Sequence, residues 1–79
     1  TRGPGAGEGV ARLGDRERQV AVAVGRGLAN ADIAAELYLS VATVKAHVSR
    51  ILAKLDLDNR VQIALLAHDA GLLEETDTP

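Results

Sequence analysis

The chain has 79 residues, and its 11 acidic and 9 basic side chains give a formal net charge of −2. It has no Cys, which excludes disulfides, thiolate metal sites and thiol nucleophiles. Hydrophobic residues make up 47% of the chain and Tyr38 is the single aromatic, so the core of this one small domain must come from Leu, Val, Ile and Ala. The acidic balance argues against a nucleic-acid-binding protein, which usually carries a basic excess.

The two ends differ in composition from the middle. Residues 1–12 are rich in Gly, which predicts a flexible linker or arm. Because this linker stands at the front of a chain that lacks an initial Met, we expect an upstream regulatory domain in the full-length protein. Residues 74–79 are acidic and polar and predict a disordered tail. The folded domain is therefore expected over residues 13–73.

The first expected element, over residues 15–26, has an ambiguous pattern. Its segment VAVAV alternates in side-chain bulk, which suits a strand. However, the residues at both the odd and the even positions of this segment are apolar, and Ala is a strong helix former. The charged segment DRER is typical of a first helical turn. We favour a helix that ends near Gly25 to Gly27 and turns Val20 and Val24 inward.

Two helices separated by a short turn are expected next. Residues 30–37 predict a short helix with Asn30 as its N-cap. A turn over 38–40 follows, and Ser40 caps a longer helix over 41–55 with an apolar period near 3.6. Two short helices joined by a three-residue turn match the spacing of a helix-turn-helix. No strand is expected anywhere, so the predicted fold is a compact all-α domain of four helices.

The fourth helix is expected over 60–70, because Asn59 followed by Gln62 resembles a capping box and Gly71 ends the pattern. It has more apolar surface than one core needs. A second stripe at i, i+4 and i+7 is either the edge of a broad core face or a dimer patch, and we favour the dimer patch. The residues of this stripe are Val61, Leu65 and His68.

The polar face of the helix over 41–55 carries Lys45, Arg50 and Lys54 and no acid. On charge alone, a solvated face and a binding surface explain it equally well. Small side chains favour the binding surface, because Thr43, Ala46 and Ser49 keep the face slim. A DNA major groove about 12 Å wide admits a helix of this kind.

Over about 60 residues, from Leu13 to Leu72, the chain resembles the C-terminal DNA-binding domain of LuxR/GerE-type regulators, especially those of NarL/FixJ-class response regulators. The resemblance is carried by LGDRERQV, GLANADIAAELYLS, VATVKAHVSRILAKLDL, NRVQIA and AGL. It implies that the helix over 41–55 is the recognition helix and that the fourth helix pairs two domains. The implied DNA-contacting residues are Thr43, Lys45, Ala46, His47, Ser49, Arg50, Lys54 and Arg60.

The chain departs from the family pattern at a few of these positions. Gly14 replaces the usual Thr cap of the first helix, where Asp15 is the substitute. Ala42 and Ala46 lack the polar groups that relatives often have, so direct base contacts rest on Lys45 and Ser49. Arg60 has a structural alternative, an ion pair with Glu17 or another acid.

Together with these patterns, the resemblance implies a sequence-specific DNA-binding domain of a bacterial, cytoplasmic transcriptional regulator. It would bind an inverted repeat in double-stranded DNA as a homodimer. The alternative is a helical protein–protein interaction module that does not bind DNA. No catalytic constellation, metal site or cofactor site is expected, and no apolar run is long enough to span a membrane.

Overall fold

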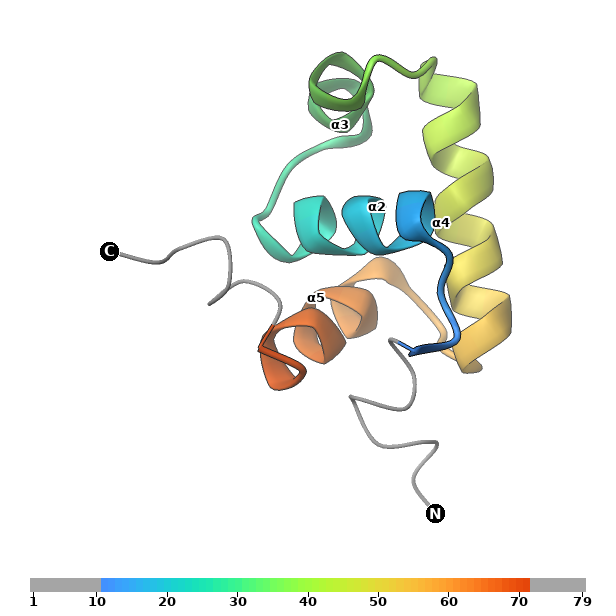
Figure 1. Ribbon diagram of the computed structural model, residues 1–79, viewed down its shortest axis with the longest axis vertical. Coiled ribbons are helices and arrows are strands. Elements are labelled where there is room, and N and C mark those ends of the chain that lie inside the picture. The colour runs from blue at the N-terminus through green and yellow to red at the C-terminus, as the bar shows by residue number, and fades with distance from the viewer. Residues whose placement is uncertain (1–10, 72–79) are drawn as a thin grey trace.

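The computed structural model describes residues 11–71, which form four helices (Figure 1). These are α2 (Asp15–Gly25), α3 (Asn30–Leu37), α4 (Val41–Leu55) and α5 (Arg60–Asp69). The described residues contain no strand, so the all-α prediction is confirmed, including a helix for the alternating VAVAV segment. The predicted tail over 74–79 lies outside the described residues, as does the predicted arm apart from its last two residues.

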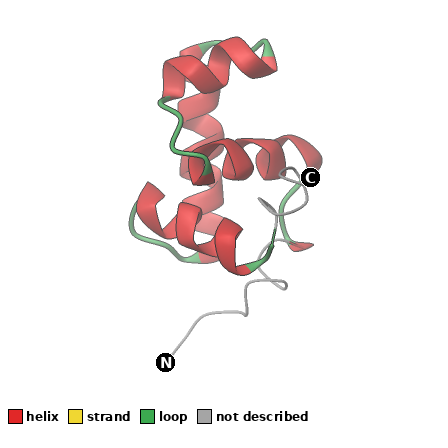
Figure 2. Ribbon diagram, turned by 90° about the vertical axis from the view of Figure 1, so that its left-hand side faces the viewer, coloured by secondary structure: helices red, strands yellow, loops and turns green. Residues whose placement is uncertain are grey.

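The longest helix, α4, runs along one side of the domain, and α2, α3 and α5 lie against it (Figure 1). Helix α2 lies between α3 and α5, packing most extensively on α5 and also on α4. Helix α3 packs on α4 near the turn that joins them, and the view at 90° shows α3 projecting at one end (Figure 2). One long side of α4 is therefore left uncovered by the other helices.

One apolar core joins all four helices. Its largest fully buried side chains come from every helix, and they are Val20, Ile33, Val44, Ile51 and Ile63. Burying a side chain of this size contributes about 1.5–3 kcal/mol relative to leaving it exposed. Ala21 and Ala23 are also buried, so small side chains let α2 approach its neighbours closely. The inward orientation predicted for Val20 and Val24 is confirmed.

Side-chain caps fix the starts of α4 and α5. The Ser40 hydroxyl accepts a hydrogen bond from the Thr43 backbone N–H at 3.0 Å, as predicted. The Asn59 side chain accepts from the backbone N–H groups of Val61 and Gln62. The Gln62 side chain, however, accepts from the Asp58 N–H instead of completing a capping box with Asn59.

Two other predicted caps are wrong, because each residue belongs to its helix. Asp15 is the first residue of α2 and Gly14 is the N-cap. Asn30 is the first residue of α3, where Ala29 is the N-cap and its N–H donates to Asp32 at 3.4 Å. The Asn30 side chain instead accepts a hydrogen bond from Arg60.

None of the helices within residues 11–71 combines the length and the apolar character that a bilayer crossing requires.

Candidate nucleic-acid interface

The uncovered side of α4 has a narrow centre and basic edges. Its centre is a stripe of exposed small residues at i, i+4, i+7 and i+11, made of Ala42, Ala46, Ser49 and Ala53. Lys45 is exposed on one side of this stripe, and Arg50 and Lys54 lie on the other side. No acidic residue occurs on α4. The helix therefore presents a slim surface of uniformly positive charge that can approach a groove wall closely.

The start of α4 can donate hydrogen bonds to an anion. The Ser40 hydroxyl donates to the Thr43 hydroxyl oxygen at 2.8 Å. This one bond uses one of the two hydroxyl protons, so the other can donate to a ligand. Both side chains are exposed, and the positive end of the α4 dipole lies at the same place. This end of the helix suits a phosphate group.

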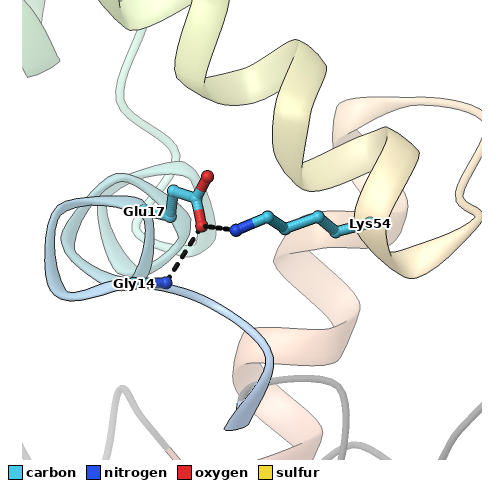
Figure 3. Close-up of polar contacts among 3 residues, drawn as sticks. All are labelled: Gly14, Glu17 and Lys54. Atoms are coloured by element: carbon cyan, nitrogen blue, oxygen red, sulfur yellow. Dashed lines mark hydrogen bonds and ion pairs between the residues drawn. The ribbon is translucent and has the colours of Figure 1, made fainter.

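Lys54 lies at the edge of the exposed face of α4, and its side chain reaches a buried carboxylate. Its Nζ lies 2.7 Å from Glu17 Oε1, which also accepts the Gly14 backbone N–H at 2.9 Å (Figure 3). Glu17 is only 7% exposed. The pKa of the Glu17 carboxyl is lowered, mainly by the hydrogen bond from Lys54 and next by the hydrogen bond from the Gly14 N–H. Burial of the carboxyl acts in the opposite direction but is the weaker effect. Lys54 therefore has a structural role whether or not it also contacts a ligand.

Arg60 is half-buried at the start of α5, and its guanidinium is engaged within the fold. It donates to the Asn30 side-chain oxygen at 2.7 Å and to the Leu28 carbonyl oxygen at 2.9 Å. The structural alternative for Arg60, an ion pair with Glu17 or another acid, is wrong in its partner: Glu17 pairs with Lys54, and the described contacts of Arg60 are with uncharged oxygens. Arg60 instead ties α5 to the connection between α2 and α3.

His47 is half-buried, and its Nδ1 atom is buried without a hydrogen-bond partner among the described residues. His47 lies close enough to Glu17 to be the smallest of the influences that lower the pKa of the Glu17 carboxyl. The ring thus lies on the side of α4 that faces α2, away from the centre of the small-residue stripe. Within residues 11–71, no three His, Asp or Glu side chains are placed to hold a metal ion.

A second exposed surface lies on α5. Val61 is 62% exposed and Leu65 is 59% exposed, and His68 is exposed one turn further on. Val61 also borders a shallow, mostly apolar cavity of 240 Å³. The residues that line this cavity are Val24, Gly27, Leu28, Arg60, Val61 and Ala64. The three residues of the predicted second stripe therefore share an exposed face, and we call Val61, Leu65 and His68 the α5 patch.

The structure places five of the eight predicted DNA-contacting residues together on the exposed face of α4, namely Thr43, Lys45, Ala46, Ser49 and Arg50. Lys54 lies at the edge of that face, and Arg60 lies on another helix. Sequence analysis missed Ala53, which continues the small-residue stripe by one turn. The i, i+4 and i+7 spacing of small residues in the sequence was the signal that could have identified it.

Comparison with known proteins gives a consistent picture. Residues 11–67 match the family model described as "Bacterial regulatory proteins, luxR family". The chain is 46% identical over 56 residues to the uncharacterized transcriptional regulatory protein YhcZ of Bacillus subtilis and 39% identical over 56 residues to the transcriptional regulatory protein LiaR of the same organism. These matches cover 71% of this chain and 26% of each relative.

A third relative is the response regulator protein VraR of Staphylococcus aureus, which is 34% identical over 62 residues. That match covers 78% of this chain and 30% of VraR. The chain therefore corresponds to less than a third of the length of the relatives that it matches.

Proposed function

Because the chain belongs to the luxR family of bacterial regulatory proteins, we propose that it recognises a specific DNA sequence on behalf of a transcriptional regulator. The domain is a LuxR-type DNA-binding helix-turn-helix, in which α3 and α4 form the motif. In the proposed complex, α4 enters the major groove. The observation that carries this proposal is the exposed face of α4, which combines basic edges, a centre of small side chains and no acid.

The proposed contacts fall into two classes. Lys45 and Ser49 contact base edges, and Ala46 offers its methyl group to a thymine methyl. Thr43 and Arg50 contact phosphates, which position the helix without reading sequence. His47, Lys54 and Arg60 contribute at the border of the interface, where the internal hydrogen bonds of Lys54 and Arg60 hold their charge in place.

We further propose that two copies pair through the α5 patch. The support is the exposure of two large apolar side chains, Val61 and Leu65, beside a shallow apolar cavity. In a two-fold dimer the same patch serves both copies. We propose that this pairing places the two α4 helices in successive major grooves. The proposed site is therefore an inverted repeat whose half-sites lie about 10 bp apart.

The full-length protein is proposed to be a bacterial response regulator of the cytoplasm, in which an upstream domain controls pairing. This rests on the relatives that carry the same domain within longer regulatory proteins, one of them named as a response regulator. Phosphorylation of that upstream domain would shift the equilibrium from monomer to dimer, and the dimer would bind both half-sites of the DNA tightly.

A titration at several salt concentrations tests the proposal and separates it from a protein–protein interaction module. The 79-residue chain is titrated against a fluorescent duplex that it has itself selected from a random-sequence pool, and against an unselected duplex. A DNA-binding domain loses affinity with the logarithm of salt at a slope of about −0.9 for each phosphate neutralised. Equal affinity for both duplexes, or no binding to either, contradicts the proposed function.

A further inference from the structure

Tyr38 has no role in the packing of the domain. It is the only aromatic residue of the chain, and its side chain is 93% exposed. It follows the last residue of α3 and opens the turn that leads into α4. Aromatic rings normally stabilise a domain through the large area that they bury, and this ring buries almost none. The core therefore does not explain why this position holds tyrosine.

The backbone of Tyr38 makes the choice of residue more unusual. Its φ of 58° and ψ of 44° lie in the left-handed region, which costs an L-residue roughly 1–2 kcal/mol. The other described residues with positive φ are Gly27, Asp56 and Gly71, and these residue types tolerate this region. The end of α3 explains the conformation itself, because the N–H groups of Tyr38 and Leu39 both donate to the Ala34 carbonyl oxygen. Such a helix end favours glycine or asparagine, so it does not explain the choice of tyrosine.

The surroundings of Tyr38 suit an anion. The Arg16 guanidinium donates to the carbonyl oxygen of Leu37 at 3.5 Å, which brings a positive charge beside the turn. On the other side of the turn, the exposed hydroxyl groups of Ser40 and Thr43 begin α4. The nearest preceding acid, Glu36, is paired with Arg26 at 3.0 Å.

We propose that Tyr38 is an additional DNA contact, in which its hydroxyl donates to a phosphate oxygen beside the groove that α4 enters and its ring packs on the adjoining deoxyribose. This proposal rests on the proposed function. The turn and the start of α4 lie at the same end of the domain (Figure 1), and the first residues of a recognition helix are those that reach the bases. Tyr38 lies in the turn that leads into that helix, three residues before Val41, and this turn faces the groove wall in the proposed complex. Tyrosine side chains donate hydrogen bonds to DNA phosphates.

Because Tyr38 is the only tyrosine, tetranitromethane reports on it in the unmodified chain. The nitration rate is measured by mass spectrometry, free and saturated with the selected duplex, with N-acetyltyrosinamide in the same solution as an internal control. We expect the bound duplex to slow nitration of Tyr38 severalfold and to leave the control unchanged. An unchanged rate for Tyr38 in a saturated complex overturns the proposal while the proposed DNA binding stands.

Two substitutions separate the contribution of the Tyr38 hydroxyl to DNA binding from the contributions of its ring and its backbone conformation. Tyr38→Phe removes only the hydroxyl and is expected to weaken binding to the selected duplex roughly three- to tenfold. Tyr38→Gly is expected to weaken binding at least as much, yet to raise the melting temperature by roughly 4 °C, because glycine relieves the left-handed backbone. Wild-type affinity in both variants overturns the Tyr38 contact alone. Absence of DNA binding by the wild-type chain overturns both this contact and the proposed function.

Discussion

Lys54 on α4 and Glu17 on α2 form an ion pair at 2.7 Å, and Glu17 is almost completely buried. The same carboxylate oxygen accepts the N–H of Gly14, the N-cap of α2. One buried carboxylate thus holds the start of α2 and the last turns of α4 together. This contact adds to the apolar packing that positions α4 against the core.

Glu17 should make the stability of the domain depend on acidic pH. Its pKa in the folded chain is lowered, mainly by the hydrogen bond from Lys54. The stabilisation is therefore fully present above the unfolded-state pKa of about 4.3, and it is lost as the pH falls through the folded-state pKa. Thermal unfolding of wild type and Glu17→Gln, followed by circular dichroism, should show a smaller loss of stability on acidification for the variant.

The other carboxylates contribute to acid unfolding in both chains, so the comparison isolates Glu17. Glu36→Gln is the matched control, because Glu36 pairs with Arg26 at the surface and both side chains are about half exposed. It should retain the wild-type pH dependence. Identical acid profiles for wild type and Glu17→Gln would show that the carboxylate is not held as the structure describes.

Lys54→Ala should destabilise the domain by about 1–3 kcal/mol, because it leaves the buried Glu17 carboxylate without its charged partner. Arg26→Ala, which breaks the exposed pair with Glu36, should cost less than about 1 kcal/mol. Urea unfolding of both variants measures the difference. In a double-mutant cycle, adding Glu17→Gln to Lys54→Ala should recover part of the loss. Additive effects of the two substitutions would contradict a direct interaction.

The α5 patch should be required for pairing but not for folding. Val61→Glu combined with Leu65→Glu places two negative charges on the surface through which we propose that two copies pair, so binding to an inverted repeat should weaken and sedimentation should report only monomers. The helical circular dichroism signal should stay, since both side chains are largely exposed in the isolated domain. Ala35→Glu, an exposed change on α3, is the control. Unaltered paired-site binding by the double variant would show that another surface forms the dimer.

Local features of the sequence predicted the helices well. The bounds of α3 and α4 agree with the prediction, because apolar spacing and the Ser40 cap are encoded within a few residues of each helix end. The contacts of Lys54 and Arg60 could not be predicted in the same way. Their partners Glu17 and Asn30 lie 37 and 30 residues away in the chain, and only the packing of the helices brings them together.

The same limit applies to the caps of α2 and α3. Asp15 and Asn30 have the residue types of N-caps, and the register of each helix decides that they are its first residues instead. Asn30 is then free to accept a hydrogen bond from Arg60. In sequence, Tyr38 was simply a residue of a turn, and only its backbone angles and exposure distinguish it.

The base preference of Lys45→Ala tests most directly whether the exposed face of α4 reads DNA sequence. Affinities of wild type and variant are compared on the selected duplex and on duplexes with single base-pair changes, with Arg18→Ala as a control that removes one exposed positive charge from α2. Lys45→Ala should lose about 1–3 kcal/mol on the selected duplex and discriminate less at one base pair, whereas Arg18→Ala should keep the wild-type preference. Wild-type affinity and preference in Lys45→Ala would contradict the base contact that is proposed for Lys45.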